Sequence, residues 1–180
     1  MKHLILLRGI NVSGHRIIKM ADLRERLENA GFSGVKTYIQ SGNVVLESAL
    51  SKDALRDKIS KSLEKWYGFE VGVFVVGKAD LEKVVAQSPF DPIPEEGTKK
   101  QYVTFLSTKP DTSLVKAWNE IGLSPETAVF GPEVIYLKYS DSAANTKLDN
   151  KFIESKLKVS ATTRNWNTTL LLASWLDVKP

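Results

Sequence analysis

The spacing of hydrophobic residues changes several times along the chain, and each change indicates a new secondary-structure element. Leu4–Leu7 is an unbroken apolar run typical of a buried strand, whereas Met20, Leu23 and Leu27 recur at helical spacing. By these criteria the first half contains a strand at 2–8, a helix at 20–30, strands at 35–39 and 43–47, a helix at 51–68 and a strand at 70–76. This β-α-β-β-α-β order is the ferredoxin-like arrangement.

The same order returns in the second half. It follows a short helix at 79–86 and a segment rich in proline. The predicted elements are strands at 101–107, 127–130, 134–140 and 159–163, helices at 114–121 and 148–157, and an added helix at 168–176. We therefore predict an α+β protein with two ferredoxin-like subdomains in tandem and an added C-terminal helix. The predicted boundaries are 1–88, a linker at 89–100, and 101–180; one continuous α+β domain with a longer sheet is the alternative.

Composition restricts the chemistry. The chain has 180 residues, 42% of them hydrophobic and 26% charged, as is usual for a soluble globular protein. It has no cysteine, and its two histidines, His3 and His15, are too few for a His-rich metal site, so we predict no metal and no cofactor. The apolar run at 4–7 is too short for a signal peptide or a membrane span. We expect a cytoplasmic protein without a membrane partner.

Positive charge is concentrated near the N-terminus. The formal net charge of the chain is +4, and the first twenty residues alone carry Lys2, Arg8, Arg16 and Lys19 with no acidic residue. Such an excess is often only a solvated face. The alternative is an anionic partner, either a small molecule or nucleic acid.

The predicted topology brings distant polar loops together. In a ferredoxin-like unit, the loop after the first strand and the hairpin between the second and third strands lie at the same end of the sheet. RGINVSGHR (8–16) should therefore lie beside QSGN (40–43), and TTRNWN (162–167) should lie near SDSAANTK (140–147). In the second half, the residues expected to meet are Thr163, Arg164, Asn165, Asn145 and Lys147.

The two clusters carry amides, hydroxyls and guanidinium groups, which suit recognition of phosphate, carboxylate or a nucleobase better than bond cleavage. Gly9 and Gly14 have P-loop spacing, but His15 and Arg16 stand where a P-loop needs Lys and Ser or Thr. A looser anion cradle of backbone amides competes with the interpretation that both glycines only shape the loop. The ligand-binding residues that we predict are Arg8, Asn11, Gln40, Ser41, Asn43, Thr163, Arg164, Asn165 and Asn167.

Three other interpretations stay open. An enzyme would use the same pocket, with Ser41 or His15 as the acting group. An interaction protein would use the motifs only to hold its subdomains together. RNA binding on a sheet face needs aromatic side chains on the first and third strands, where the second half offers Tyr102 and Tyr136 without an RNP1-like sequence.

The residues of the segment ATTRNWNTTLLLA (161–173) have different expected roles. Asn165 or Asn167 can cap the closing helix. Arg164 is not explained by capping, because a cation beside a helix N-terminus is unfavourable unless an anion lies between them. The sequence leaves open what Arg164 holds.

Three motifs, LLRGINVSG, TYIQSGNVV and ATTRNWNT, resemble those of the bacterial family known as domain of unknown function 1697. The resemblance extends from the first strand to the final helix and implies two ferredoxin-like subdomains, with no activity to carry over. That family usually has a glycine at the position of Ser13, which weakens the case for a strictly glycine-dependent phosphate cradle. The matching positions are Arg8, Gly9, Asn11, Gly14, Tyr38, Gln40, Ser41, Gly42, Asn43, Thr163, Arg164, Asn165, Trp166 and Asn167.

Overall fold

The computed structural model describes residues 1–89, 100–131, 133–141, 143 and 145–179. The predicted linker at 89–100 lies outside the described residues, apart from its two ends. The chain divides into two compact units, one formed by Met1–Lys83 with Leu172–Pro180 and the other by Val84–Leu171. The subdomain boundaries proposed from the sequence remain a prediction.

The first unit is a four-stranded antiparallel sheet with two helices between its strands. Its elements are β1 (Lys2–Arg8), α1 (Met20–Asn29), β2 (Ser33–Tyr38), β3 (Asn43–Glu47), α2 (Lys52–Tyr67) and β4 (Gly72–Gly77), after which comes α3 (Lys78–Ala86). The strand order is β2-β3-β1-β4, and every pair is antiparallel. The ferredoxin-like prediction is confirmed for this unit.

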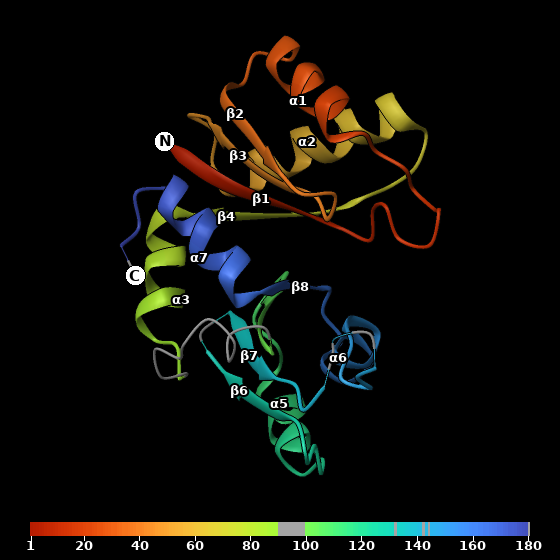
Figure 1. The fold of residues 1–180 in the computed structure, drawn as a ribbon, viewed down its shortest axis with the longest axis vertical. Coiled ribbons are helices and arrows are strands. Elements are labelled where there is room, and N and C mark those ends of the chain that lie inside the picture. Colours follow the sequence, from red (N-terminus) through yellow and green to blue (C-terminus); the bar gives the residue numbers. More distant parts are fainter. Residues whose placement is uncertain (90–99, 132, 142, 144, 180) are drawn as a thin grey trace. The chain divides into compact units, whose positions relative to one another are not determined.

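Helices α1 and α2 cover one face of this sheet (Figure 1). Leu23 and Leu27 come from α1, and Leu55 and Ile59 come from α2, so the helical spacing in the sequence aligns these side chains on one buried stripe. Helix α2 begins where the Ser51 side chain accepts a hydrogen bond of 3.3 Å from a backbone N–H of the first turn.

The second unit repeats the arrangement. Its elements are β5 (Gln101–Leu106), α5 (Thr112–Asn119), β6 (Thr127–Phe130), β7 (Val134–Lys138), α6 (Asn150–Leu157) and β8 (Ala161–Asn165). Helix α7 (Trp166–Trp175) begins in this unit, and its residues from Leu172 onward belong to the first unit. The order β6-β7-β5-β8 is again antiparallel throughout. Two separate four-stranded sheets confirm the predicted fold class, so the alternative of one longer sheet is wrong.

The core of the second unit lies between its sheet and helices α5 and α6. Trp118, Ile135 and Ile153 are buried there. Asp149 caps α6, because its side chain accepts a hydrogen bond of 2.8 Å from the backbone N–H of Phe152. Capping is therefore the described role of this aspartate.

The C-terminal segment closes the second face of the first sheet. Trp175 makes an edge-to-face contact with Tyr38 at 5.9 Å between ring centroids, and Lys36 Nζ lies 5.7 Å from the Trp175 ring. Lys2 forms an ion pair of 2.7 Å with Asp177. These contacts place the C-terminal segment against β1 and β2 of the first sheet. No helix in the described part of the chain is long and apolar enough to cross a bilayer.

Candidate functional site

The side chain of Asn11 joins the two predicted loops at one end of the first sheet. Its Nδ2 donates hydrogen bonds to the carbonyl oxygens of Gln40 (2.8 Å) and Ile18 (3.0 Å), and its Oδ1 accepts one of 2.8 Å from the backbone N–H of Ile18. The backbone N–H of Leu7 donates to the carbonyl of Gly42 at 2.8 Å. The structure thus brings RGINVSGHR beside QSGN, as the topology predicts. We call these three contacts of Asn11 the Asn11 clamp.

The buried side chain of Asn43 forms hydrogen bonds within the β2–β3 hairpin. Its side chain is buried, and Nδ2 donates to the Tyr38 carbonyl at 3.1 Å and to Ser41 Oγ at 2.9 Å. The described bonds of Asn11 and Asn43 are therefore made to the protein itself. Gln40 and Ser41 are exposed at the tip. A ligand-binding role for these four residues stays a prediction.

The backbone of both loops is strained. Seven of their residues have positive φ: Gly9, Asn11, Ser13, Gly14, Arg16, Ile39 and Gly42. Ile39 has φ 46°, which a β-branched residue rarely adopts, and it lies just beyond the end of β2 although the sequence pattern assigned it to that strand. A Cβ at Gly42 would lie 2.7 Å from the Cβ of Leu7, so this turn requires glycine. Such strain persists only where the surrounding structure holds it in place, and it is concentrated at functional sites.

Two arginines lie where β1 runs into its loop. Arg8 is half-buried and its stem passes over Gly72, where an added Cβ would lie 3.2 Å from the Cβ of Arg8. Arg16 is exposed and folds back towards Gly9, whose added Cβ would lie 3.7 Å from Arg16 Nη1. Arg8 thus ends β1 beside Gly72 of β4, and Arg16 belongs to the loop that follows β1.

The nearest acidic residue in sequence is already engaged. Asp22 accepts a hydrogen bond of 2.7 Å from the Tyr67 hydroxyl and forms an ion pair of 2.9 Å with Arg26, and these contacts hold the pKa of its carboxyl below the usual value. No carboxylate occurs between residues 1 and 21.

Sequence reasoning missed the aliphatic side chains of the same loops. Val12, Ile17 and Ile39 are 59%, 55% and 50% exposed. The apolar pattern of the sequence predicts burial for such residues. Ile39 itself has positive φ, whereas Val12 and Ile17 lie in a loop whose neighbouring residues Asn11, Ser13 and Arg16 have it, and a sequence does not reveal these conformations.

The second predicted cluster makes a different set of contacts. Thr163 Oγ1 lies 2.7 Å from Thr104 Oγ1 and donates to Asn150 Oδ1 at 2.6 Å. Asn145, which was expected to meet Thr163, donates instead to Asp141 at 2.8 Å. The strand therefore meets the start of α6, a few residues beyond the predicted contact.

Asn165 caps the closing helix. Its Oδ1 accepts a hydrogen bond of 3.0 Å from the backbone N–H of Asn167, and its Nδ2 donates to the Gln101 carbonyl at 3.4 Å. The sequence predicted either Asn165 or Asn167 as the cap of this helix, and this hydrogen bond identifies Asn165. Asn167 is exposed in the first turn of α7.

Arg164 is a strand residue and not part of the cap. It pairs with Val103 of β5 and is only 7% exposed. Nη1 donates to Thr162 Oγ1 at 2.9 Å and to the Thr163 carbonyl at 2.8 Å. Burial lowers the pKa of the guanidinium to about 10. The predicted strand end at Thr163 was two residues short, and this is why Arg164 was expected at a helix terminus.

Gln101 shares the sheet face of Arg164 and was not identified from the sequence. It precedes Val103 by two positions on β5, so both side chains project from one face. It is fully buried, and within the described structure neither Nε2 nor Oε1 has a hydrogen-bond partner.

The structure also shows the surroundings of the residues that the enzyme and RNA-binding interpretations would use. Ser41 Oγ accepts the bond from Asn43, and His15 is exposed, with its backbone N–H bonded to the Val12 carbonyl at 2.9 Å. Tyr102 pairs with Leu137 on β7, so it projects from the face opposite to that of Tyr136. Tyr136 is buried and donates to the Val84 carbonyl at 2.8 Å. The two tyrosines therefore do not form an exposed stacking platform.

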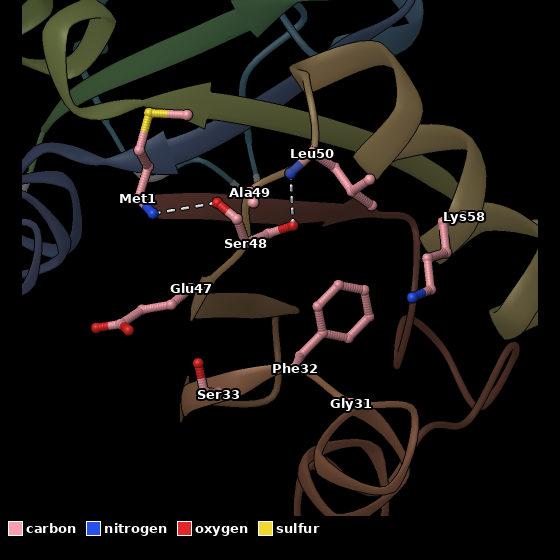
Figure 2. Close-up of a pocket in the computed structure, with 9 residues that line it drawn as sticks. All are labelled: Met1, Gly31, Phe32, Ser33, Glu47, Ser48, Ala49, Leu50 and Lys58. Atoms are coloured by element: carbon pink, nitrogen blue, oxygen red, sulfur yellow. Dashed lines mark hydrogen bonds between the residues drawn. The ribbon is translucent and has the colours of Figure 1, made fainter.

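A hollow of about 370 Å³ opens beside β2 in the first unit (Figure 2). Lys58 Nζ lies 4.8 Å from the centroid of the Phe32 ring on one side, and the carboxylate of Glu47 lies on the other. The Ser48 hydroxyl is bonded to the backbone N–H of Leu50 at 3.1 Å. The lining also includes the N-terminal ammonium of Met1, which donates to the Ser48 carbonyl at 3.1 Å, and none of the predicted site residues belongs to it. Among the described residues, no group of three or more histidine or acidic side chains is placed to hold a metal ion.

Comparisons with known proteins agree with the three motifs. The model of a family described as "Protein of unknown function (DUF1697)" matches residues 1–136. One solved structure similar to the chain is that of conserved bacterial protein SP0830 from Streptococcus pneumoniae, with 26% identity, a TM-score of 0.78, and coverage of 97% of this chain and 98% of that chain. No curated protein matches the chain. The structural match therefore includes the third motif, which lies beyond the residues that the family model matches.

Proposed function

Because the chain belongs to the DUF1697 family, described as proteins of unknown function, we propose its role from its own side chains. It is a small binding protein for an anionic ligand, either a nucleotide or the phosphate of a nucleic acid. The binding surface is the loop end of the first sheet, formed by the β1–α1 loop and the β2–β3 hairpin.

The observation that supports this proposal is the Asn11 clamp. It holds two loops at a fixed separation, so Arg8 and Arg16 of one loop are presented together with the exposed Gln40 and Ser41 of the other. Guanidinium groups bind phosphate through charge-assisted hydrogen bonds, and exposed amides and hydroxyls supply further partners. No acidic residue precedes Asp22 in the sequence.

A thermal-shift screen with ATP, GTP and heparin, followed by calorimetric titration, tests the proposal. A ligand that binds only the folded protein raises the midpoint of unfolding, and the stabilisation grows with the logarithm of the ligand concentration once that concentration exceeds Kd. Arg16→Asn removes the charge and keeps a residue that tolerates positive φ, so it should weaken binding without unfolding the loop. Lys61→Gln, at an exposed position of α2, is the matched control and should bind normally. No stabilisation by any of the three probes would argue against anion binding.

An architectural role is the second candidate, and it concerns the C-terminal motif. Thr163 bonds Thr104 and Asn150, and Asn165 caps α7, so these side chains have described partners within their own unit. On this view the C-terminal motif fixes the junction between β8 and α7. Loss of stability without loss of ligand affinity in Thr163→Val would support it.

A further inference from the structure

The hollow beside β2 lies at the end of the first sheet opposite to the loop end (Figure 2). Strand β2 begins there at Ser33 and β3 ends there at Glu47, whereas the β1–α1 loop and the β2–β3 hairpin lie where β1 ends and β3 begins. The hollow and the loop end share no residue. A ligand of the hollow is therefore independent of the proposed function and goes beyond it.

Phe32 forms the apolar wall of the hollow. Helix α1 is followed by Gly31, which has φ 89°, and the backbone N–H of Phe32 donates to the Leu27 carbonyl at 3.2 Å. This is the glycine turn that commonly ends a helix, and it brings the next hydrophobic side chain back against the structure. Phe32 is only 6% exposed, and its ring faces the hollow (Figure 2). The ring is therefore held in place before a ligand arrives.

The carboxylate of Glu47 lies on one side of this ring. Glu47 is exposed at the end of β3, and its side chain passes over Gly34, where an added Cβ would lie 3.2 Å from Glu47 Cγ. The absence of a side chain at Gly34 thus gives the stem of Glu47 its place. Glu47 forms no ion pair with any residue that the structure describes. Its negative charge is available to a ligand.

Two ammonium groups complete the charges of the hollow. Lys58 extends from α2, and its Nζ lies 4.8 Å from the centroid of the Phe32 ring. The ammonium of Met1 donates to the Ser48 carbonyl at 3.1 Å. Figure 2 shows the Met1 ammonium and the Glu47 carboxylate on one side of the ring and the Lys58 ammonium on the other. The lining therefore presents one negative and two positive groups around one aromatic ring.

The segment between β3 and α2 is fixed by hydrogen bonds at the rim of the hollow. The backbone N–H of Ser48 donates to the Met1 carbonyl at 3.0 Å, and Ser48 Oγ accepts a bond of 3.1 Å from the Leu50 N–H. Groups that are already in position lose less conformational entropy when a ligand binds. The rim therefore favours binding of a small ligand.

The charges of the lining define the chemistry of the ligand. A carboxylate pairs with an ammonium and an ammonium pairs with a carboxylate, each through charge-assisted hydrogen bonds. A ligand that matches all three groups carries one ammonium and two carboxylates, and a spacer that crosses the ring separates one carboxylate from the other two groups. The acidic amino acids have this arrangement. The volume of about 370 Å³ also belongs to the small end of ligand pockets.

We propose that the hollow binds an acidic amino acid such as glutamate. Its α-ammonium pairs with Glu47, and its α-carboxylate pairs with the ammonium of Met1. Its side-chain carboxylate pairs with Lys58, and the methylene groups between the two ends contact the ring of Phe32.

The test titrates the full chain, labelled for nitrogen NMR, with L-glutamate. All three charges of the lining are open to water, so the dissociation constant should be millimolar. The amide signals that move should be those of residues 31–33 and 47–50. Three analogues each lack one charged group: glutarate lacks the ammonium, glutamine the side-chain carboxylate and γ-aminobutyrate the α-carboxylate. Each should bind about fivefold more weakly than glutamate, as expected for the loss of one water-exposed charge pair.

Substitutions in the hollow should match the analogues. Lys58→Gln should weaken glutamate binding about fivefold and leave glutamine binding unchanged, because glutamine already lacks the partner of Lys58. Glu47→Gln should weaken glutamate binding by a similar factor and should not weaken glutarate binding. General loss of structure would affect every ligand alike. Glu28→Gln on α1 and Lys61→Gln on α2, both at exposed positions outside the hollow, are the matched controls and should bind glutamate normally.

Three results would overturn the inference. The first is that millimolar glutamate moves none of the amides at 31–33 and 47–50. The second is that glutarate binds as tightly as glutamate, because the hollow then recognises no ammonium. The third is that the amides at 8–16 and 40–43 move instead, which would assign the ligand to the loop end and support anion binding there. Arg16→Asn should leave glutamate binding in the hollow unchanged, so the failure of either proposal is distinguishable from the failure of the other.

Discussion

The side chain of Asn11 donates a hydrogen bond of 2.8 Å to the carbonyl oxygen of Gln40, which lies 29 residues further along the chain. This bond ties the loop after β1 to the hairpin between β2 and β3. Together with the bond of 2.8 Å from the Leu7 N–H to the Gly42 carbonyl, it holds the β1–α1 loop beside the polar tip of the hairpin.

Replacing Asn11 should therefore disturb both stability and binding. Asn11→Gly keeps a residue suited to φ 54° and removes the three side-chain hydrogen bonds, each worth about 1 kcal/mol. We expect a loss of about 2–3 kcal/mol in the free energy of unfolding, measured by urea denaturation. Asn11→Ala should cost more, by about 1 kcal/mol, because it adds backbone strain. Equal stability of wild type and Asn11→Gly would show that the Asn11 clamp does not contribute to the free energy of unfolding.

Gly42 and Gly14 can be compared to test how closely the hairpin approaches β1. Both have positive φ, 79° and 76°, but a Cβ at Gly42 would lie 2.7 Å from Leu7, whereas one at Gly14 meets nothing within 4 Å. Gly14→Ala should cost about 1 kcal/mol, for the backbone alone. Gly42→Ala adds a steric clash with the core and should cost about 2–4 kcal/mol. Similar losses in both variants would mean that the hairpin can move away from β1 without penalty.

The sequence predicted the elements well because burial imposes a period on the chain. The spacing of Leu23 and Leu27 predicted α1, and the apolar run at 4–7 predicted β1, because each pattern reflects a face packed against a core. Fold class followed from the order of the elements. The ends of elements were less certain: β8 continues to Asn165 because its backbone pairs with β5, and the register of that pairing is invisible in the sequence.

The structure brings together the two loops that the topology predicts, whereas a ligand-binding role for their residues stays a prediction. Asn11 and Asn43 were expected to hold a ligand, because amides in polar loops are ligand groups as often as structural ones. Their described partners are mostly backbone carbonyls, such as those of Gln40 and Tyr38, which any residue could supply and which no motif reveals. Ile39 was assigned to a strand, and only its φ of 46° turns it into the solvent.

His3 should make the stability of the protein depend on pH. It is buried on β1, and within the described structure neither ring nitrogen has a hydrogen-bond partner. Burial, followed by the N-terminal ammonium group and Lys52, lowers the pKa of the imidazole from its ordinary value of 6.5, while a backbone contact with Ser48 and the charge of Asp80 oppose this shift. The folded state therefore keeps the ring neutral where the unfolded chain takes up a proton.

The sign of the effect follows directly. Below pH 6.5 the unfolded state binds more protons than the folded state, so stability should fall as the pH is lowered through this range, by at most about 1.4 kcal/mol per unit for this one group. Urea denaturation of wild type and His3→Leu between pH 7.5 and 5 measures it. In the variant, the free energy of unfolding should depend less steeply on pH, and the variant should become more stable than wild type near pH 5. An unchanged slope would mean that His3 is not its source.

The two asparagines of the C-terminal motif should differ sharply in their contribution to α7. Asn165 Oδ1 accepts the 3.0 Å bond from the N–H of Asn167, whereas the exposed Asn167 side chain lies on the first turn. Asn165→Ala removes the cap and should cost about 1 kcal/mol in the free energy of unfolding. Asn165→Asp keeps the acceptor and places a negative charge at the helix N-terminus, so it should retain most of that stability.

Asn167→Ala is the internal control for this prediction. Alanine has the higher helix propensity, so this substitution should be neutral or stabilise the helix by a few tenths of a kcal/mol. Urea denaturation and hydrogen exchange of the α7 amides measure both effects. Because the chain from Leu172 onward packs with the first unit, fraying at Asn165 should also increase exchange at the amides that follow the first turn. If Asn167→Ala costs as much as Asn165→Ala, the asparagines act through another contact and the cap does not hold this end of the helix.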